Sequence, residues 1–203
     1  MSLLLLALVC APLPVPEFGG AFAARMAEKR HPELRRASLT AWNLLAYGLS
    51  LMGAERLPEV DFTPRGKPFF PDSPLHFSLT HSGALAAALL SGAPCGVDLE
   101  RVRPEVAQRM RARCLNEREQ AEAPDFFACW TKKECIAKLD GSGMRVHPDA
   151  LDTLDPRYAH RFFCERVRDT DGREYVLSAL CDGAEALRPL PVSPGALVRS
   201  QRP

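Results

Sequence analysis

Two carboxylates lie two residues apart in the segment Gly96-Val97-Asp98-Leu99-Glu100. Because residues i and i+2 of a β-strand point to the same face, Asp98 and Glu100 would face one side and Leu99 the other. Carboxylate oxygens at this spacing suit a hard divalent cation, and Mg²⁺ usually combines one or two carboxylates with the phosphates of a substrate. The pair therefore indicates either a metal–phosphate site or a solvated strand face.

Glu134 and Lys138 lie four residues apart in the segment Trp130-Thr131-Lys132-Lys133-Glu134-Cys135-Ile136-Ala137-Lys138. On a helix they share a face, and the order Glu before Lys favours an ordinary surface ion pair. Trp130 lies one turn before Glu134 on that face, and a purely solvated face would not usually begin with tryptophan. The alternative is a face that supplies a third carboxylate and an ammonium group to a metal–phosphate site.

Further basic residues could bind an anion. Lys67 lies in the turn Arg65-Gly66-Lys67-Pro68, and His81 ends a short alternating segment just before Gly83. Taken singly, an exposed loop lysine and a structural histidine remain the alternatives. The approach to the first long helix is also basic, which indicates either a solvated face or an anion site; its basic residues are Arg25, Lys29, Arg30, Arg35 and Arg36.

Periodicity and turn residues predict the elements that must position these groups. Helices are expected over residues 32–52, 104–115 and 125–139. Strands are expected at the apolar start, ended by Pro12, and over 76–81, 95–100, 161–167 and 174–181. Residues 84–90 favour a helix by propensity and a buried strand by length. The strands near 76–100 suggest an antiparallel meander, and Asp171-Gly172 suggests a hairpin turn. Residues 53–75 are expected to form connecting turns, and the proline-rich segment from about 189 is expected to be a loosely held tail.

Length and composition limit the classes of protein. The chain has 203 residues, 46% of them hydrophobic, and a formal net charge of +1. These values are typical of a folded globular chain and lack the basic excess of a nucleic-acid binder. The seven cysteines form no CxxC pair, which argues against a zinc site or a disulfide framework and indicates a reducing compartment. The apolar start is far shorter than the ~20 residues of a membrane span, so we expect no membrane association.

The element order predicts an α+β architecture of two halves, residues 1–103 and 104–203. The motifs then occur in a specific order: Gly66-Lys67-Pro68, Phe77-Ser78-Leu79-Thr80-His81-Ser82, Gly96-Val97-Asp98-Leu99-Glu100, and Trp130-Thr131-Lys132-Lys133-Glu134 followed by Lys138. In this order the chain closely resembles the 4′-phosphopantetheinyl transferases of the surfactin-synthetase-activating (Sfp) type. The resemblance covers roughly residues 20–180.

The resemblance implies a fold of two similar α/β halves related by a pseudo-two-fold axis, with coenzyme A bound in the cleft between them. It implies three metal ligands, Asp98, Glu100 and Glu134. Residues expected to contact coenzyme A are Lys67, Thr80, His81, Lys133 and either Arg35 or Arg36, with the arginine at the 3′-phosphate. Lys138 matches the lysine that holds the pyrophosphate near the reacting centre.

The implied reaction is transfer of the phosphopantetheine arm from coenzyme A to a serine of an acyl or peptidyl carrier protein, with release of adenosine 3′,5′-bisphosphate. Mg²⁺ is the expected metal, with Mn²⁺ as the alternative, and Glu134 is the candidate base. A cytoplasmic monomer that binds neither nucleic acid nor membrane is expected.

Two other interpretations stay open. The chain could be a non-catalytic relative that binds carrier proteins without modifying them, although three converging carboxylates would have no purpose there. It could also be an unrelated Mg²⁺-dependent phosphohydrolase, in which the Gly-Lys-Pro and Thr-His-Ser segments would have no obvious role.

Overall fold

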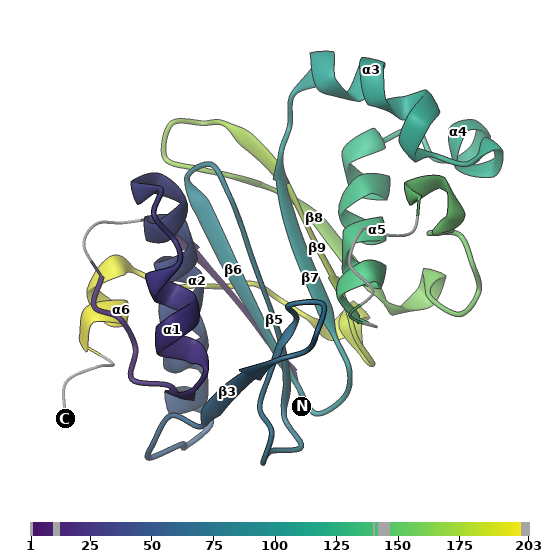
Figure 1. Cartoon of the computed structure of the whole chain (residues 1–203). Helices are drawn as coiled ribbons and strands as arrows, with labels where there is room; N and C mark the ends of the chain where they lie inside the picture. The colour runs from purple at the N-terminus through teal and green to yellow at the C-terminus, as the bar shows by residue number, and fades with distance from the viewer. Residues whose placement is uncertain (1, 10–12, 140, 142–146, 200–203) are drawn as a thin grey trace.

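A computed structural model of the chain describes residues 2–9, 13–139, 141 and 147–199, and it shows a mixed α/β fold with several sheets (Figure 1). The first sheet has the strand order β10-β1-β6-β5, formed by Leu190–Pro191, Ser2–Leu8, Leu85–Ser91 and His76–Ser82. The second has the order β7-β9-β8, formed by Gly96–Arg101, Glu174–Leu180 and Phe162–Arg168. A small sheet has the order β2-β3-β4, formed by Gly19–Gly20, Glu59–Phe62 and Pro68–Phe69.

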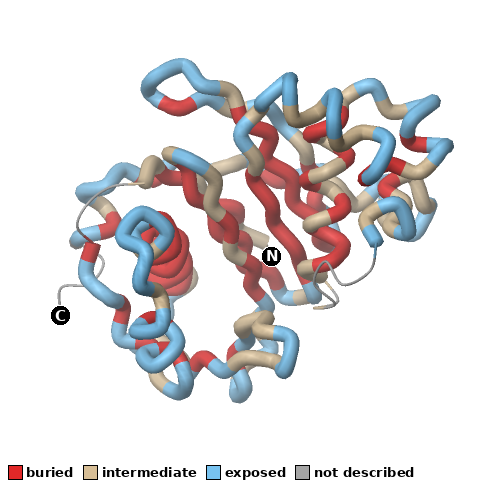
Figure 2. Tube along the Cα trace, turned by 45° about the horizontal axis from the view of Figure 1, so that its top comes forward, coloured by how far each residue is buried: buried red, intermediate tan, exposed pale blue. Residues whose placement is uncertain are grey.

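Helices cover these sheets. They are α1 (Phe22–Ala27), α2 (Pro32–Leu51), α3 (Pro104–Cys114), α4 (Glu117–Glu122), α5 (Phe126–Leu139) and α6 (Pro194–Arg199), with 3₁₀ turns at Pro148–Ala150, Ala159–Arg161 and Ala184–Ala186. Figure 1 shows α2 over the first sheet and α5 beside β7 and β9. In Figure 2 the buried residues follow the central strands and α2, and the exposed residues lie on outer helices and turns. None of the described helices has the length and apolar character needed to cross a membrane.

Most elements expected from the sequence are confirmed. The apolar start is β1, although Pro12, expected to end it, lies outside the described residues. The three predicted helices are α2, α3 and α5, and the predicted hairpin is formed by β8 and β9. The ambiguous segment 84–90 is strand β6, buried along its whole length between β1 and β5. Burial on both faces explains its uniformly apolar sequence, which carries no strand period.

Two expectations were wrong. The meander does not extend to a third strand, because β7 pairs antiparallel with β9 in the other sheet and not with β6. As far as residue 199, the described part of the tail is not loosely held. β10 pairs parallel with β1, Val192 donates its backbone N–H to Leu6, and the side chain of Leu197 is fully buried in the core of the first sheet. Residues 53–75, expected as turns, also contain β3 and β4.

Side-chain hydroxyls join the two large sheets. Ser78, Thr80 and Ser82 alternate along β5, so they share one face, and β5 lies at the edge of the first sheet opposite β7 at the edge of the second. We call these three residues the hydroxyl seam. Its bonds are Val97 N to Ser78 Oγ at 3.1 Å, Thr80 Oγ1 to Asp98 Oδ1 at 3.1 Å, Ser82 Oγ to Glu100 Oε2 at 3.1 Å and Arg101 N to Ser82 Oγ at 3.2 Å. The seam satisfies backbone groups that an edge strand would otherwise leave unpaired.

The sheets do not divide at residue 103, where the two halves were expected to meet. β7 lies before residue 103 in the sequence but belongs to the second sheet. β10 lies well after residue 103 but belongs to the first sheet. Each end of the chain is therefore fixed to an element that is distant in sequence. A boundary between two halves at residue 103 stays a prediction.

Candidate functional site

A pocket with a volume of about 680 Å³ lies beside the hydroxyl seam. Its walls come from α1 and the turn after it, α2, the turn between β3 and β4, β5, β7 and α5. Elements far apart in sequence thus contribute to one concavity. Nine of the candidate site residues named from the sequence line it: Arg25, Lys29, Lys67, Thr80, His81, Asp98, Glu100, Glu134 and Lys138.

Asp98 lies at the centre of the polar wall and is buried. Its Oδ1 atom accepts hydrogen bonds from Thr80 Oγ1 at 3.1 Å and from Lys138 Nζ at 2.6 Å. Lys138 Nζ also donates to the backbone oxygen of Val97 at 2.9 Å. Its ion pair with Asp98 therefore links α5 to β7. Burial lowers the pKa of Lys138, but the attraction of Asp98 outweighs it, so this pKa lies above its ordinary value and the ammonium stays charged.

Glu134 is half-buried on α5 and faces two other carboxylates. Burial raises its pKa to about 7, the charges of Asp98 and Glu100 act in the same direction, and Lys138 opposes them. A carboxyl group in this position exchanges its proton near neutral pH, as a group that accepts and releases protons during a reaction should.

Glu100 lies at the outer edge of the pocket, and each of its oxygens has a partner. Oε2 accepts from Ser82 Oγ at 3.1 Å, and Oε1 pairs with Arg103 Nη2 at 2.7 Å. Asp98 and Glu100 bond to Thr80 and Ser82, which lie on one face of β5, so the two carboxylates share one face of β7 as expected.

Positively charged side chains from α1 and the turn after it also line the pocket. Arg25 and Lys29 belong to the wall, and Lys29 lies beside His81. Burial and the neighbouring guanidinium of Arg25 lower the pKa of Lys29. Burial, Lys29 and Lys138 in turn lower the pKa of His81. Such mutual repulsion is relieved by a bound anion, so this part of the pocket suits phosphate groups.

Lys67 lies at the rim, where it connects two parts of the chain. Its Nζ atom donates to the backbone oxygen of Leu139 at 2.8 Å, at the carboxyl end of α5. An ammonium group at this end also interacts favourably with the helix dipole. Lys67 therefore fixes the end of the helix that carries Glu134 and Lys138.

Three residues expected at coenzyme A lie outside the pocket wall. Arg36 is exposed and Arg35 half-exposed on the first turns of α2. Arg25 and Lys29, two of the basic residues that precede α2, line the pocket instead. The sequence carried a signal for this pair, since Arg25 and Lys29 are four residues apart beside Phe22 and Met26, which are buried.

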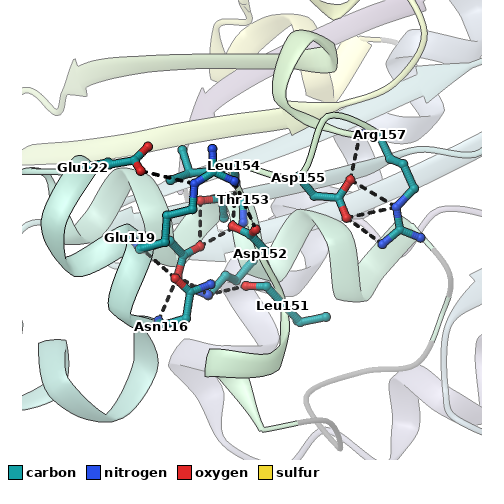
Figure 3. A network of polar contacts seen from close by, with 11 residues as sticks. Asn116, Glu119, Glu122, Leu151, Asp152, Thr153, Leu154, Asp155 and Arg157 are labelled. Atoms are coloured by element: carbon teal, nitrogen blue, oxygen red, sulfur yellow. Dashed lines mark hydrogen bonds and ion pairs between the residues drawn. The ribbon is translucent and has the colours of Figure 1, made fainter.

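Lys133 is the third, and it pairs with Glu119 away from the pocket wall. Figure 3 shows the polar contacts around Glu119. The side chain of Lys133 is fully buried and pairs with the buried carboxylate of Glu119 at 2.5 Å. Lys133 Nζ also donates to the backbone oxygens of Pro148, at 3.0 Å, and Leu151. Although Lys133 precedes Glu134, successive residues of a helix point about 100° apart, so the two side chains face different surroundings.

The three carboxylates offer hard oxygen donors, the ligand type that Mg²⁺ prefers. Among the described residues no set of three or more His, Cys, Asp or Glu side chains is close enough to form a metal site in advance. Asp98, Glu100 and Glu134 nevertheless line the same pocket, and the charges of Asp98 and Glu100 act on Glu134. A divalent cation there would relieve the repulsion, so the donor set fits such an ion.

Comparison with known proteins agrees with this geometry. Residues 94–180 match the family model of the 4′-phosphopantetheinyl transferase superfamily. The chain is 28% identical to a 4′-phosphopantetheinyl transferase of Bacillus subtilis, over 86% of this chain and 92% of that protein. It is 40% identical to the 4′-phosphopantetheinyl transferase AcpT of Escherichia coli (strain K12), over 42% of this chain and 50% of that protein. The gsp transferase of Aneurinibacillus migulanus is 31% identical over 40% of this chain and 37% of that protein.

The matched region contains β7 and α5, the two elements that carry the carboxylates and Lys138. The chain spans nearly the whole Bacillus subtilis relative and about half of the Escherichia coli one. These likenesses support a transferase, and residues 94–180 are similar to the 4′-phosphopantetheinyl transferase superfamily.

Proposed function

We propose that the chain transfers the 4′-phosphopantetheine group of coenzyme A to a serine hydroxyl of an apo acyl or peptidyl carrier protein. One observation carries the proposal: three carboxylates, Lys138 and the cationic side chains of Arg25 and Lys29 all line a single pocket. A diphosphate needs both, because its charge must be neutralised while a nearby group accepts a proton. The names of the relatives support the same activity.

The cationic side chains would bind the phosphates of coenzyme A. We assign Arg25 and Lys29 to this role, with His81 between them and the carboxylates. A bound phosphate would raise the lowered pKa of Lys29 and of His81, because it would replace repulsion by attraction. Thr80 and Lys67 belong to the same wall, where they hold Asp98 and the end of α5.

In the proposed reaction the serine oxygen attacks the β-phosphorus of coenzyme A. A new bond forms between that oxygen and phosphorus, and the bond from the β-phosphorus to the bridging oxygen breaks. The serine proton passes to Glu134, the candidate base on α5. Adenosine 3′,5′-bisphosphate leaves with the bridging oxygen, and Lys138 faces the negative charge that develops there.

Asp98, Glu100 and Glu134 would hold the Mg²⁺ ion that this chemistry requires, with Mn²⁺ as an alternative. When bound, such an ion neutralises charge on the phosphate oxygens. Asp98 would keep its bonds to Thr80 and Lys138, which fix its orientation.

We further propose that the chain is of the Sfp type, with two halves related by a pseudo-two-fold axis and the pocket between them. In support, each large sheet has one long helix on it, α2 on the first and α5 on the second, and the pocket lies where their edge strands meet. A monomer in the cytoplasm completes the proposal. The buried free cysteines, Cys95, Cys114, Cys129, Cys135 and Cys181, fit a reducing compartment.

Incubating the purified chain with a fluorescent coenzyme A, Mg²⁺ and several apo carrier proteins tests the proposal. The expected result is label on the carrier, lost when its acceptor serine is replaced by alanine. Release of adenosine bisphosphate without label would indicate a phosphohydrolase. Binding of the carrier with neither label nor release would indicate a non-catalytic relative.

A further inference from the structure

Ser82, the last residue of the hydroxyl seam, differs from the other two because its hydroxyl bonds in both directions. It donates to Glu100 Oε2 at 3.1 Å and accepts the backbone N–H of Arg101 at 3.2 Å. The backbone donor fixes where the oxygen lies, and the hydrogen then has one direction left, toward the carboxylate. Ser82 thus connects a strand of the first sheet to the carboxylate of Glu100 in the second.

The carboxylate of Glu100 is held at both oxygens, by Ser82 on Oε2 and by Arg103 on Oε1. Each carboxylate oxygen has two lone pairs, so one on each remains for a further partner. Glu100 belongs to the pocket wall. Of its two partners, Arg103 is an exposed side chain with many rotamers, whereas Ser82 is short and set on a strand. Ser82 is therefore the more rigid of the two.

The turn that follows Ser82 is anchored independently. The backbone N–H of Ala84 donates to the hydroxyl of Tyr175 at 3.2 Å, and that hydroxyl donates to Asp169 Oδ2 at 3.0 Å. Gly83 has a φ of +53°, and a Cβ there would lie 2.7 Å from the Tyr175 hydroxyl. Removing the Ser82 hydroxyl should leave this turn in place, so its loss acts on Glu100 and on one backbone amide.

We propose that Ser82 is a positioning residue: its hydroxyl fixes the carboxylate of Glu100 in the orientation in which it binds the divalent cation. The proposal rests on the function proposed above. Groups that orient a metal-binding side chain commonly change metal affinity by about 10- to 100-fold when they are removed. Ser82 acts through Glu100 and need not touch coenzyme A or the carrier.

Mn²⁺ alone, titrated with coenzyme A present and followed by electron paramagnetic resonance, serves as the probe. Ser82→Ala should weaken Mn²⁺ binding about tenfold and raise by a similar factor the Mg²⁺ concentration needed for half-maximal labelling. The KM for coenzyme A at saturating Mg²⁺ should stay within about twofold, because Arg25 and Lys29 are intact. The backbone amide of Arg101 should exchange its hydrogen faster, and Ser82→Thr should restore Mn²⁺ binding.

Ser78→Ala is the matched control. Ser78 occupies the same face of β5 and accepts a backbone N–H from β7, that of Val97, at 3.1 Å, but it contacts no carboxylate in the described hydrogen bonds. Its loss should lower the melting temperature, since a buried amide loses its acceptor. It should leave Mn²⁺ affinity at the wild-type value.

The positioning role is overturned if Ser82→Ala binds Mn²⁺ like wild type, if Ser78→Ala weakens binding equally, or if the wild-type chain does not bind Mn²⁺. Failure of the proposed function is a different result: wild type then labels no carrier. The titration and the amide exchange at Arg101 would still decide the role of Ser82.

Discussion

Replacing Lys133 by methionine distinguishes a structural role, as the ion-pair partner of Glu119, from a contact with coenzyme A. Lys133 and Glu119 are both fully buried and lie 2.5 Å apart, so the substitution leaves a carboxylate without its counter-charge. Removing one partner of a buried ion pair costs about 3–5 kcal/mol. Glu119 keeps three further donors, the backbone N–H groups of Asn116 and Thr153 and the Thr153 hydroxyl, which places the cost near the lower limit.

A loss of about 3 kcal/mol corresponds to a fall in melting temperature of about 6–12 °C for a chain of this length. Calorimetry of Lys133→Met, Glu119→Leu and the double variant measures it. Because the double variant leaves no charge unpaired, its loss should be clearly smaller than the sum of the two single losses.

The kinetic part of this experiment addresses the pocket. Lys133 lies outside the pocket wall, so folded Lys133→Met should keep the wild-type KM for coenzyme A. The opposite pattern, an unchanged melting temperature with a KM raised tenfold or more, would refute the structural role. That result would instead support the contact between Lys133 and coenzyme A that the family resemblance implied.

Three further outcomes are expected. Glu134→Gln should remain folded and lose at least about 100-fold in labelling rate, because it removes the proposed base; activity near wild type would contradict that role. Lys29→Ala should raise the KM for coenzyme A about tenfold or more, whereas alanine at exposed Arg36 should leave it unchanged. If Arg36→Ala raises the KM and Lys29→Ala does not, the anion site lies on α2. Gly96→Ala places a Cβ 2.1 Å from the backbone oxygen of Cys135, so it should displace α5 from β7 and lower both melting temperature and activity; a stable, active variant would show that α5 can shift without consequence.

The sequence was sufficient for most elements and for the residues that line the pocket. Helical spacing predicted α2, α3 and α5, and the alternation of Asp98 and Glu100 put both carboxylates on one face. These patterns depend only on neighbours along the chain. α4 was missed although Asn116 and Glu119 form a capping box that begins it, which is a local signal.

Such local patterns predict neither which strands pair nor whether a lysine side chain lies in the pocket or in the core. Three consecutive short strands favour a meander, and nothing in the sequence of β7 indicates that it pairs with β9, about 80 residues later. Lysine is almost never fully buried, and the family resemblance implied that Lys133 contacts coenzyme A. Only the folded structure shows that Lys133 forms a buried ion pair with Glu119. Residues whose role depends on a distant partner need the structure.

The pairing of β10 with β1 has a consequence for synthesis of the chain. β1 leaves the ribosome early, but β10 is complete only after residue 191, so that edge of the first sheet stays open until then. β7 likewise waits for β9. Contacts between distant segments slow folding, and open strand edges invite pairing with other chains. A chain stalled before residue 174 would thus expose both edges at once, and nascent chains should depend on protection by chaperones until their last strands dock.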